Sequence, residues 1–285
     1  MPPHPGVTDD LLSRMADDLI GINGVSAVAL GGSRARGDHA ADSDHDLGVH
    51  YRRDQLDVAG LATVAEKWTG RPTPIAGPGQ WGPWVDGGAW LRVADSPVDW
   101  ILREVDRVEE QVRRAIAGDF AFHTQPGHPL GFLDVSYAGE VAIAVPLADP
   151  TSLLARWKRH LNPYPDALRA ALVANTWQVE FVLGAARKGA RREDSAYVVL
   201  CCTHAAMMCA HAWCAQAGVW VTNEKGLIPG VAQLPVETGT FSRDVQEILG
   251  HLGSSGSELH KGIDDLQDVL GAAIRHLSES DPRGQ

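Results

Sequence analysis

The chain has 285 residues, of which 44% are hydrophobic and 21% are charged. This composition excludes disorder over most of the chain, and the length predicts about two domains. Acidic side chains outnumber basic ones by 36 to 25, which gives a net charge of −11. That balance disfavours binding to nucleic acid, because such affinity comes from a basic surface. The first residues lack the basic and apolar segments of a signal peptide, so we expect a cytoplasmic protein.

The first half of the chain alternates helical and strand-like patterns. Apolar residues at helical spacing predict helices over 9–22, 55–68 and 104–117, and alternating or β-branched runs predict strands over 25–30, 45–50, 89–93 and 98–102. The last two strands are separated by Asp95-Ser96-Pro97, a turn composition that indicates a hairpin. A segment rich in Pro, Gly and Trp from 71 to 88 is predicted to be mostly loop.

Helical patterns rich in Ala and Leu replace the strand-like alternation after about residue 145. We therefore place a domain boundary there, with domains at 1–145 and 146–285. Within the second domain the pattern predicts one helix ending near Gly189, a second over 195–218, and amphipathic helices at about 242–252 and 257–277.

One part of this second domain carries no Asp, Glu, Lys or Arg from Ala196 to Thr222, a length that could cross a bilayer. His204, His211 and Gln216 interrupt it, and Ala is its commonest residue. We therefore predict the buried central helix of a helical bundle, with no membrane partner. The cysteines within Cys201–Cys214 have no second ligand pair with zinc-like spacing, so we expect them in the core.

The tryptophans at 68, 81, 84, 90 and 100 have two interpretations. They could line an aromatic wall for an adenine or a sugar ring. Because aromatic side chains more often pack inside a protein, we predict that they belong to the core.

The segment from Leu30 to Val49 carries the clearest chemical signal. Gly32 and Ser33 directly follow a predicted strand, and Asp44 and Asp46 enter the next one after ten intervening residues. Residues two apart in a strand point to the same face, so both carboxylates project together with their Cα atoms about 6.6 Å apart. Two like charges this close favour a compensating cation, and Mg²⁺ prefers oxygen ligands. The spacing therefore predicts a divalent-metal site.

The residues between these two strands fit a phosphate group. Gly31 and Gly32 can bring backbone N–H groups close to an anion without a Cβ in the way, Ser33 adds a hydroxyl, and Arg34 and Arg36 add positive charge. The alternative is an ordinary loop with a solvated acidic strand end, since Gly, Ser and Asp are common loop residues. The strands on both sides and the Arg-x-Arg between them favour the catalytic interpretation.

This pattern resembles the nucleotidyltransferase superfamily with a polymerase-β-like catalytic domain, which is marked by Gly-Ser, Asp-x-Asp and a third carboxylate on a later strand. Gly32, Ser33, Asp44 and Asp46 fit the first two parts, and the residues around them are similar to antibiotic-type members, those that modify aminoglycosides or lincosamides. Asp99 is the candidate third carboxylate because it lies inside a β-like run.

The resemblance implies an α+β fold, with a polymerase-β-like domain built on a mixed sheet and followed by an all-α helical bundle. It implies that an acceptor hydroxyl attacks the α-phosphate of ATP or another NTP and that pyrophosphate leaves. Two Mg²⁺ ions would be held by Asp44 and Asp46, with Asp99 on the ion that activates the acceptor. Gly32 and Ser33 would position the outer phosphates.

A general base is expected from the helical domain in some members of this superfamily, and Glu180 is the candidate here, although an acidic residue on a helix is usually solvated. The favoured acceptor is a small hydroxylated molecule such as an aminoglycoside-like antibiotic, because acidic clefts attract polycations. The alternatives are a nucleotidyltransferase that acts on tRNA or protein, as toxin-like members do, and a catalytically degenerate binding module. The acidity weighs against tRNA, and the intact motif weighs against degeneracy. The sequence leaves open whether the protein is a homodimer.

Overall fold

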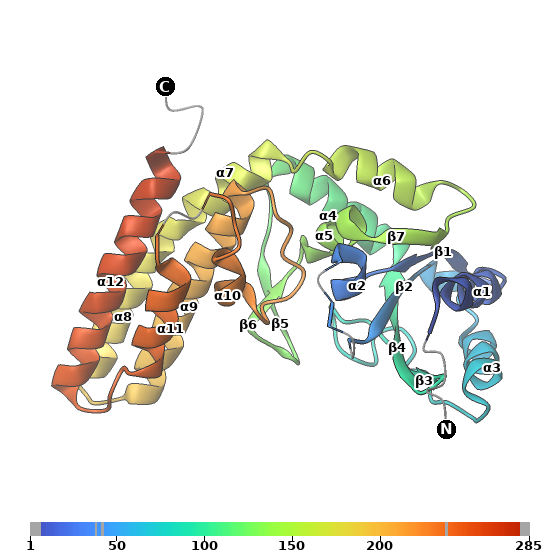
Figure 1. The fold of residues 1–285 in the computed structure, drawn as a ribbon, viewed down its shortest axis with the longest axis horizontal. Coiled ribbons are helices and arrows are strands. Elements are labelled where there is room, and N and C mark those ends of the chain that lie inside the picture. Colours follow the sequence, from blue (N-terminus) through green and yellow to red (C-terminus); the bar gives the residue numbers. More distant parts are fainter. Residues whose placement is uncertain (1–6, 38, 41–42, 237–238, 280–285) are drawn as a thin grey trace. The chain divides into compact units, whose positions relative to one another are not determined.

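A computed structural model describes residues 7–37, 39–40, 43–236 and 239–279 of the chain (Figure 1). The chain forms two compact units, the first made of Met1–Ala115 and Phe120–Pro163 and the second of Ile116–Asp119 and Tyr164–Gln285. The division after Pro163 falls later than the predicted boundary at 145, because the strand β7 (Val145–Ala148) pairs with β1 (Val25–Leu30) in the first unit.

The first unit is built on a five-stranded mixed sheet with the order β3-β4-β2-β1-β7. β2 (His45–Tyr51) runs parallel to β4 (Ser96–Glu104), whereas β1 is antiparallel to β2 and to β7, and β3 (Gly88–Val93) is antiparallel to β4. The predicted hairpin over 89–102 is confirmed, with Ala94 and Asp95 at positive φ in its turn. Together with the helical second unit, this sheet confirms the predicted α+β class.

Two helices cover one face of this sheet. α1 (Asp9–Ile20) begins at Thr8, whose side chain accepts the Leu11 N–H, and α3 (Val58–Thr69) begins at Asp57 in the same way. Their apolar sides pack onto the alternate strand residues that point toward them. The shared core contains Leu12, Met15, Leu19, Leu47, Val49, Leu61, Leu91, Val98, Trp100 and Leu102.

Shorter elements complete the first unit. α2 (Gly32–Arg36) contacts β2 and α5 (Ser136–Ile143), and α6 (Leu153–Leu161) contacts α5 and β1. α4 (Val105–Ala117) follows β4, and the 3-10 turn η1 (Arg53–Gln55) follows β2. The hairpin of β5 (Phe122–Gln125) and β6 (His128–Leu133) forms a separate two-stranded sheet. The sequence patterns predicted neither this hairpin nor β7.

The second unit is helical, as predicted. Its elements are α7 (Asp166–Ala174), the 3-10 turn η2 (Asn175–Trp177), α8 (Gln178–Ala190), α9 (Ser195–Gln216), α10 (Leu227–Val231), α11 (Phe241–Gly250) and α12 (Gly256–Glu279). In Figure 1 the long helices α8, α9, α11 and α12 run side by side, and each of the other helices of this unit contacts α9.

α9 is the apolar stretch that the sequence singled out. In the described part of the chain it is the one helix long and apolar enough to cross a membrane, yet 72% of that window is buried inside the protein. All four cysteines are buried, and His211 is 4% exposed. The helix therefore packs as the core of the bundle, as predicted from its composition.

Candidate active site

Asp46 on β2 and Asp99 on β4 lie directly beside each other in the parallel register. Neighbouring strands are about 4.8 Å apart, and paired residues point to the same face. On both strands the residues on either side of the aspartate, such as Leu47 and Trp100, point into the core on the opposite face. The two carboxylates therefore share the face of the sheet that turns away from α1 and α3.

The turn between β1 and α2 contacts Asp46. The Gly31 N–H donates a 2.8 Å hydrogen bond to the Asp46 carbonyl oxygen. Gly32 has a φ of +61°, and a Cβ at this position would overlap the Asp46 Oδ2 atom. Only glycine fits at position 32, because it tolerates a positive φ and has no Cβ. Ser33 follows in the first turn of α2, so the structure brings the predicted Gly-Ser turn next to the carboxylate of β2.

Burial and mutual repulsion both act on this group of carboxyl side chains. Burial, followed by the charges of Asp44 and Asp46, raises the pKa of Asp99 to about 7. Burial also raises the pKa of Asp46, and Asp44 and Glu140 add to this effect while Arg103 and Arg36 oppose it. A cation would relieve the repulsion, and carboxylate oxygens are the ligands that Mg²⁺ prefers. The chemistry of this donor set therefore fits a divalent metal ion.

The three carboxylates do not form a closed cage. Asp44 lies just before β2 and is exposed. Over the described residues, no group of three or more His, Cys, Asp or Glu side chains is placed close enough to hold a metal ion. The sheet therefore aligns only Asp46 and Asp99 of the predicted metal site. Asp44 lies outside the sheet, in the exposed segment before β2.

The predicted phosphate-binding arginines differ in their surroundings. The Arg34 Nε donates to the carbonyl oxygens of Ser43 and Asp44, both at 3.1 Å, and its Nη2 donates to Ser43 at 2.7 Å. Arg34 therefore holds the segment that leads into β2. Arg36 is exposed and lowers the pKa of Asp46 through its charge. A phosphate-binding role stays a prediction for both residues.

Arg103 and Glu140 form an ion pair that the sequence analysis did not single out. Arg103, 7% exposed, lies two alternations after Asp99 on the same face of β4. Its Nε and Nη2 atoms donate to the two carboxylate oxygens of Glu140 on α5, at 2.6 and 2.7 Å, and its guanidinium lies 4.9 Å from the Tyr137 ring centre. Strand alternation from Asp99 could have placed Arg103 on this face, but its partner lies 37 positions away in the chain.

Two other acidic residues, Asp86 and the predicted general base Glu180, are not part of this group. Asp86, 2% exposed, accepts hydrogen bonds from the Tyr51 hydroxyl and the Gly79 N–H and pairs with Arg53 at 3.2 Å, so it serves the structure of the loop. Glu180 is an exposed residue of α8 in the second unit, where it lines a groove of about 550 Å³. Its general-base role stays a prediction.

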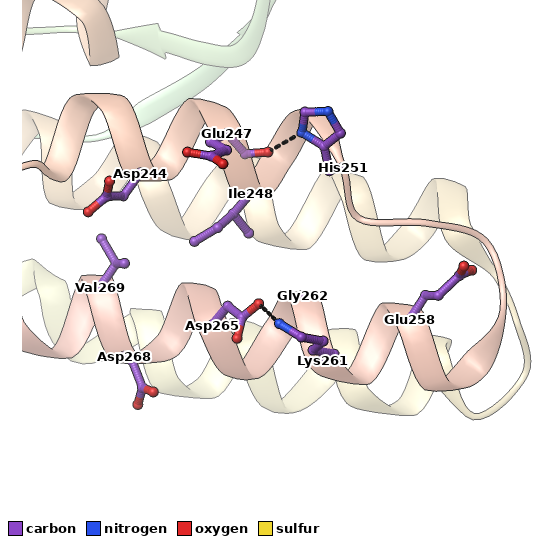
Figure 2. Close-up of a pocket in the computed structure, with 10 residues that line it drawn as sticks. All are labelled: Asp244, Glu247, Ile248, His251, Glu258, Lys261, Gly262, Asp265, Asp268 and Val269. Atoms are coloured by element: carbon purple, nitrogen blue, oxygen red, sulfur yellow. Dashed lines mark hydrogen bonds and ion pairs between the residues drawn. The ribbon is translucent and has the colours of Figure 1, made fainter.

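A second groove, of about 640 Å³, lies between α11 and α12 (Figure 2). Two of its acidic side chains, Glu258 and Asp265, bind groups at the start of α12 or within that helix. Glu258 accepts the N–H groups of Ser254 and Ser255 at the start of α12, which lowers its pKa to about 2, and Asp265 pairs with Lys261 at 2.5 Å. Figure 2 shows no convergence of its labelled side chains on one point, so we place the candidate chemistry in the first unit.

Comparison with known protein families identifies a domain in the first unit. Residues 12–76 match the family model of the nucleotidyltransferase domain. This stretch runs from α1 past α3 and contains the Gly32-Ser33 turn together with Asp44 and Asp46. The match lies within the first unit, which therefore carries a nucleotidyltransferase domain of the superfamily that the sequence motif predicted.

A solved structure of a nucleotidyltransferase-like protein from Exiguobacterium sibiricum 255-15 is 11% identical, with 96% of this chain and 77% of that chain covered and a TM-score of 0.44. No curated protein matches the sequence.

Proposed function

We propose that the protein transfers AMP from ATP to a hydroxyl group of a small molecule such as an aminoglycoside-like antibiotic and releases pyrophosphate, in the presence of Mg²⁺. The observation that supports this proposal most strongly is the register of Asp46 and Asp99 beside the Gly32 turn. An aligned pair of carboxylates next to a glycine-serine turn is the arrangement that a metal-bound triphosphate requires.

In this proposal Asp44, Asp46 and Asp99 hold two Mg²⁺ ions. The ions supply Lewis-acid stabilisation of the charge that develops during phosphoryl transfer. The Gly32 and Ser33 N–H groups and the Ser33 hydroxyl hold the outer phosphates, with Arg36 adding positive charge nearby. Arg34 fixes the backbone of Ser43 and Asp44 and so positions the first of the three carboxylates.

The reaction forms one bond and breaks one. The acceptor oxygen bonds to the α-phosphorus, the bond from that phosphorus to the bridging oxygen breaks, and pyrophosphate leaves with the electron pair. The hydroxyl proton passes to a base, for which Glu180 is our candidate. A cationic acceptor suits a chain with a net charge of −11, and we propose a cytoplasmic location.

The test measures pyrophosphate release from ATP and Mg²⁺ with a panel of hydroxylated antibiotics. We expect release with at least one compound, no release in EDTA, and a loss of at least about 1,000-fold in kcat for Asp46→Asn, because the substitution removes a charge that acts in the transition state. Asp95→Asn is the matched control, since Asp95 is exposed in the turn of the β3–β4 hairpin. Equal rates for the two variants would refute the proposed site. Label from ATP appearing in RNA or protein of a cell extract, and in no antibiotic, would move the acceptor to a macromolecule.

A further inference from the structure

An exposed tryptophan stands next to the candidate active site. Trp90 on β3 pairs directly with Asp99 on β4 in the antiparallel register. Opposite residues of an antiparallel pair point to the same face, so the indole lies on the face that carries Asp99 and Asp46. Trp90 is 68% exposed. The prediction that it belongs to the core was therefore wrong, whereas for Trp100, which is 1% exposed, it is confirmed.

Trp81 forms the second half of an aromatic platform with Trp90. The two rings stack with their centres 4.3 Å apart and their planes inclined by 18°. The loop that carries Trp81 is fixed by Gln125, a buried residue of β5, whose Nε2 donates to the Trp81 carbonyl and whose Oε1 accepts the Trp84 N–H, both at 2.9 Å. The platform is thus held in place before any ligand binds.

The strand order places this platform on one particular side of the carboxylates. Across the sheet the sequence is β1 with the Gly32 turn, β2 with Asp46, β4 with Asp99, and β3 with Trp90. In an in-line displacement the entering and leaving oxygens lie on opposite sides of the phosphorus. If the leaving pyrophosphate is held at the Gly32 turn, the hydroxyl enters from the side of β4 and β3.

We infer that Trp81 and Trp90 form the acceptor subsite of this nucleotidyltransferase, and that it takes a hydroxyl compound whose ring presents an apolar face, such as an aminosugar. This inference rests on the proposed function. A flat indole packs well against the C–H face of a saturated ring, and its π electrons attract an ammonium group. A linear hydroxyl compound would leave the platform uncovered.

The test is a calorimetric titration of the enzyme saturated with Mg²⁺ and α,β-methylene-ATP, whose α–β bridge cannot be cleaved. The probes are kanamycin and lincomycin, which contain rings, and spermidine, a linear polycation that reports attraction to the acidic surface alone. Trp90→Ala and Trp81→Ala are expected to weaken binding of at least one ring compound by about tenfold or more and to leave spermidine unchanged. Trp90→Phe should stay within about threefold of wild type, because a phenyl ring keeps a flat apolar surface.

Leu200→Ala is the matched control, because Leu200 is 61% exposed on α9 in the second unit. It should bind all probes as the wild type does. Affinity for the ATP analogue should be the same in every variant, and a loss confined to that affinity would overturn the acceptor assignment in favour of a nucleobase contact. Failure of both ring compounds to bind, or equal binding by wild type and Trp90→Ala, would also overturn it.

Pyrophosphate release separates this inference from the function on which it rests. Release that requires Asp46, with wild-type kcat/KM in Trp90→Ala, would keep the function and overturn the subsite. Binding of a ring compound that requires Trp90, with no release for any acceptor, would keep the subsite and refute the proposed transfer.

Discussion

Replacing Asp99 by Asn should stabilise the protein when no metal is present. The pKa of Asp99 rises from 3.8 to about 7 in the folded chain, through burial and the charges of Asp44 and Asp46. Below about pH 4 the carboxyl group is protonated in both folded and unfolded chains. Between about pH 4 and pH 7 the unfolded chain loses the proton and the folded chain keeps it, so the wild type loses stability as pH rises. Above about pH 7 the loss is complete and constant.

The magnitude follows from the same values. A pKa difference of this size corresponds to about 4 kcal/mol at full burial. Because Asp99 is only half-buried, solvent screening reduces the effect to about 2 kcal/mol, or about 4–8 °C in Tm.

Thermal unfolding followed by circular dichroism in EDTA at pH 4.5 and pH 8 tests this prediction. Asp99→Asn should melt only slightly above the wild type at the lower pH and clearly above it at pH 8, and Asp95→Asn should match the wild type at both. Mg²⁺ should narrow the difference at pH 8 by stabilising the wild type more. A difference that is the same at both pH values, or a less stable Asp99→Asn protein at pH 8, would refute the argument.

Two further substitutions probe the surroundings of the carboxylates. Gly32→Ala should reduce kcat/KM at least about 100-fold, because the added Cβ would displace the Asp46 carboxylate. Gly37→Ala is the control, since Gly37 also has a positive φ but has open space where a Cβ would lie; it should keep its activity and lose only about 1–2 kcal/mol of stability. Equal steady-state rates for the two variants would contradict this prediction. Arg103→Met should lower the free energy of unfolding in urea by about 1–2 kcal/mol, because Glu140, whose side chain is 31% exposed, would lose the buried guanidinium that pairs with it. Arg113→Met, at an exposed pair, should change that free energy by less than about 0.5 kcal/mol. Similar midpoints for these two variants would show that the buried pair contributes little.

Local sequence patterns predicted much of the first unit. The strands over 25–30, 45–50, 89–93 and 98–102 were recognisable because apolar residues alternate or cluster within them. By contrast, β7 has four residues with Pro146 among them, and β6 contains Pro129. Proline weakens a strand signal because it cannot donate to the ladder, so such short strands are visible only from the partners that they meet in the fold.

Some residues of the candidate site could likewise be predicted from local patterns, and others could not. Asp44 and Asp46 could be grouped from spacing alone, whereas the choice of Asp99 depended on the resemblance to a known superfamily, because spacing does not say which strands are neighbours. The pairing of Arg103 with Glu140 and the exposure of Trp90 depend on contacts between distant segments. Hydrophobicity predicts burial for a tryptophan, and that expectation fails at Trp90 on the edge strand β3.

The pairing of β7 with β1 determines where a fragment that contains only the first unit should end. β7 covers β1 along Val28–Leu30. A fragment ended at residue 145 would leave those main-chain amides and carbonyls open to another molecule, which invites aggregation between copies. A fragment expressed to isolate the first unit should therefore extend through Pro163, so that β7 pairs with β1 and α6 packs beside it.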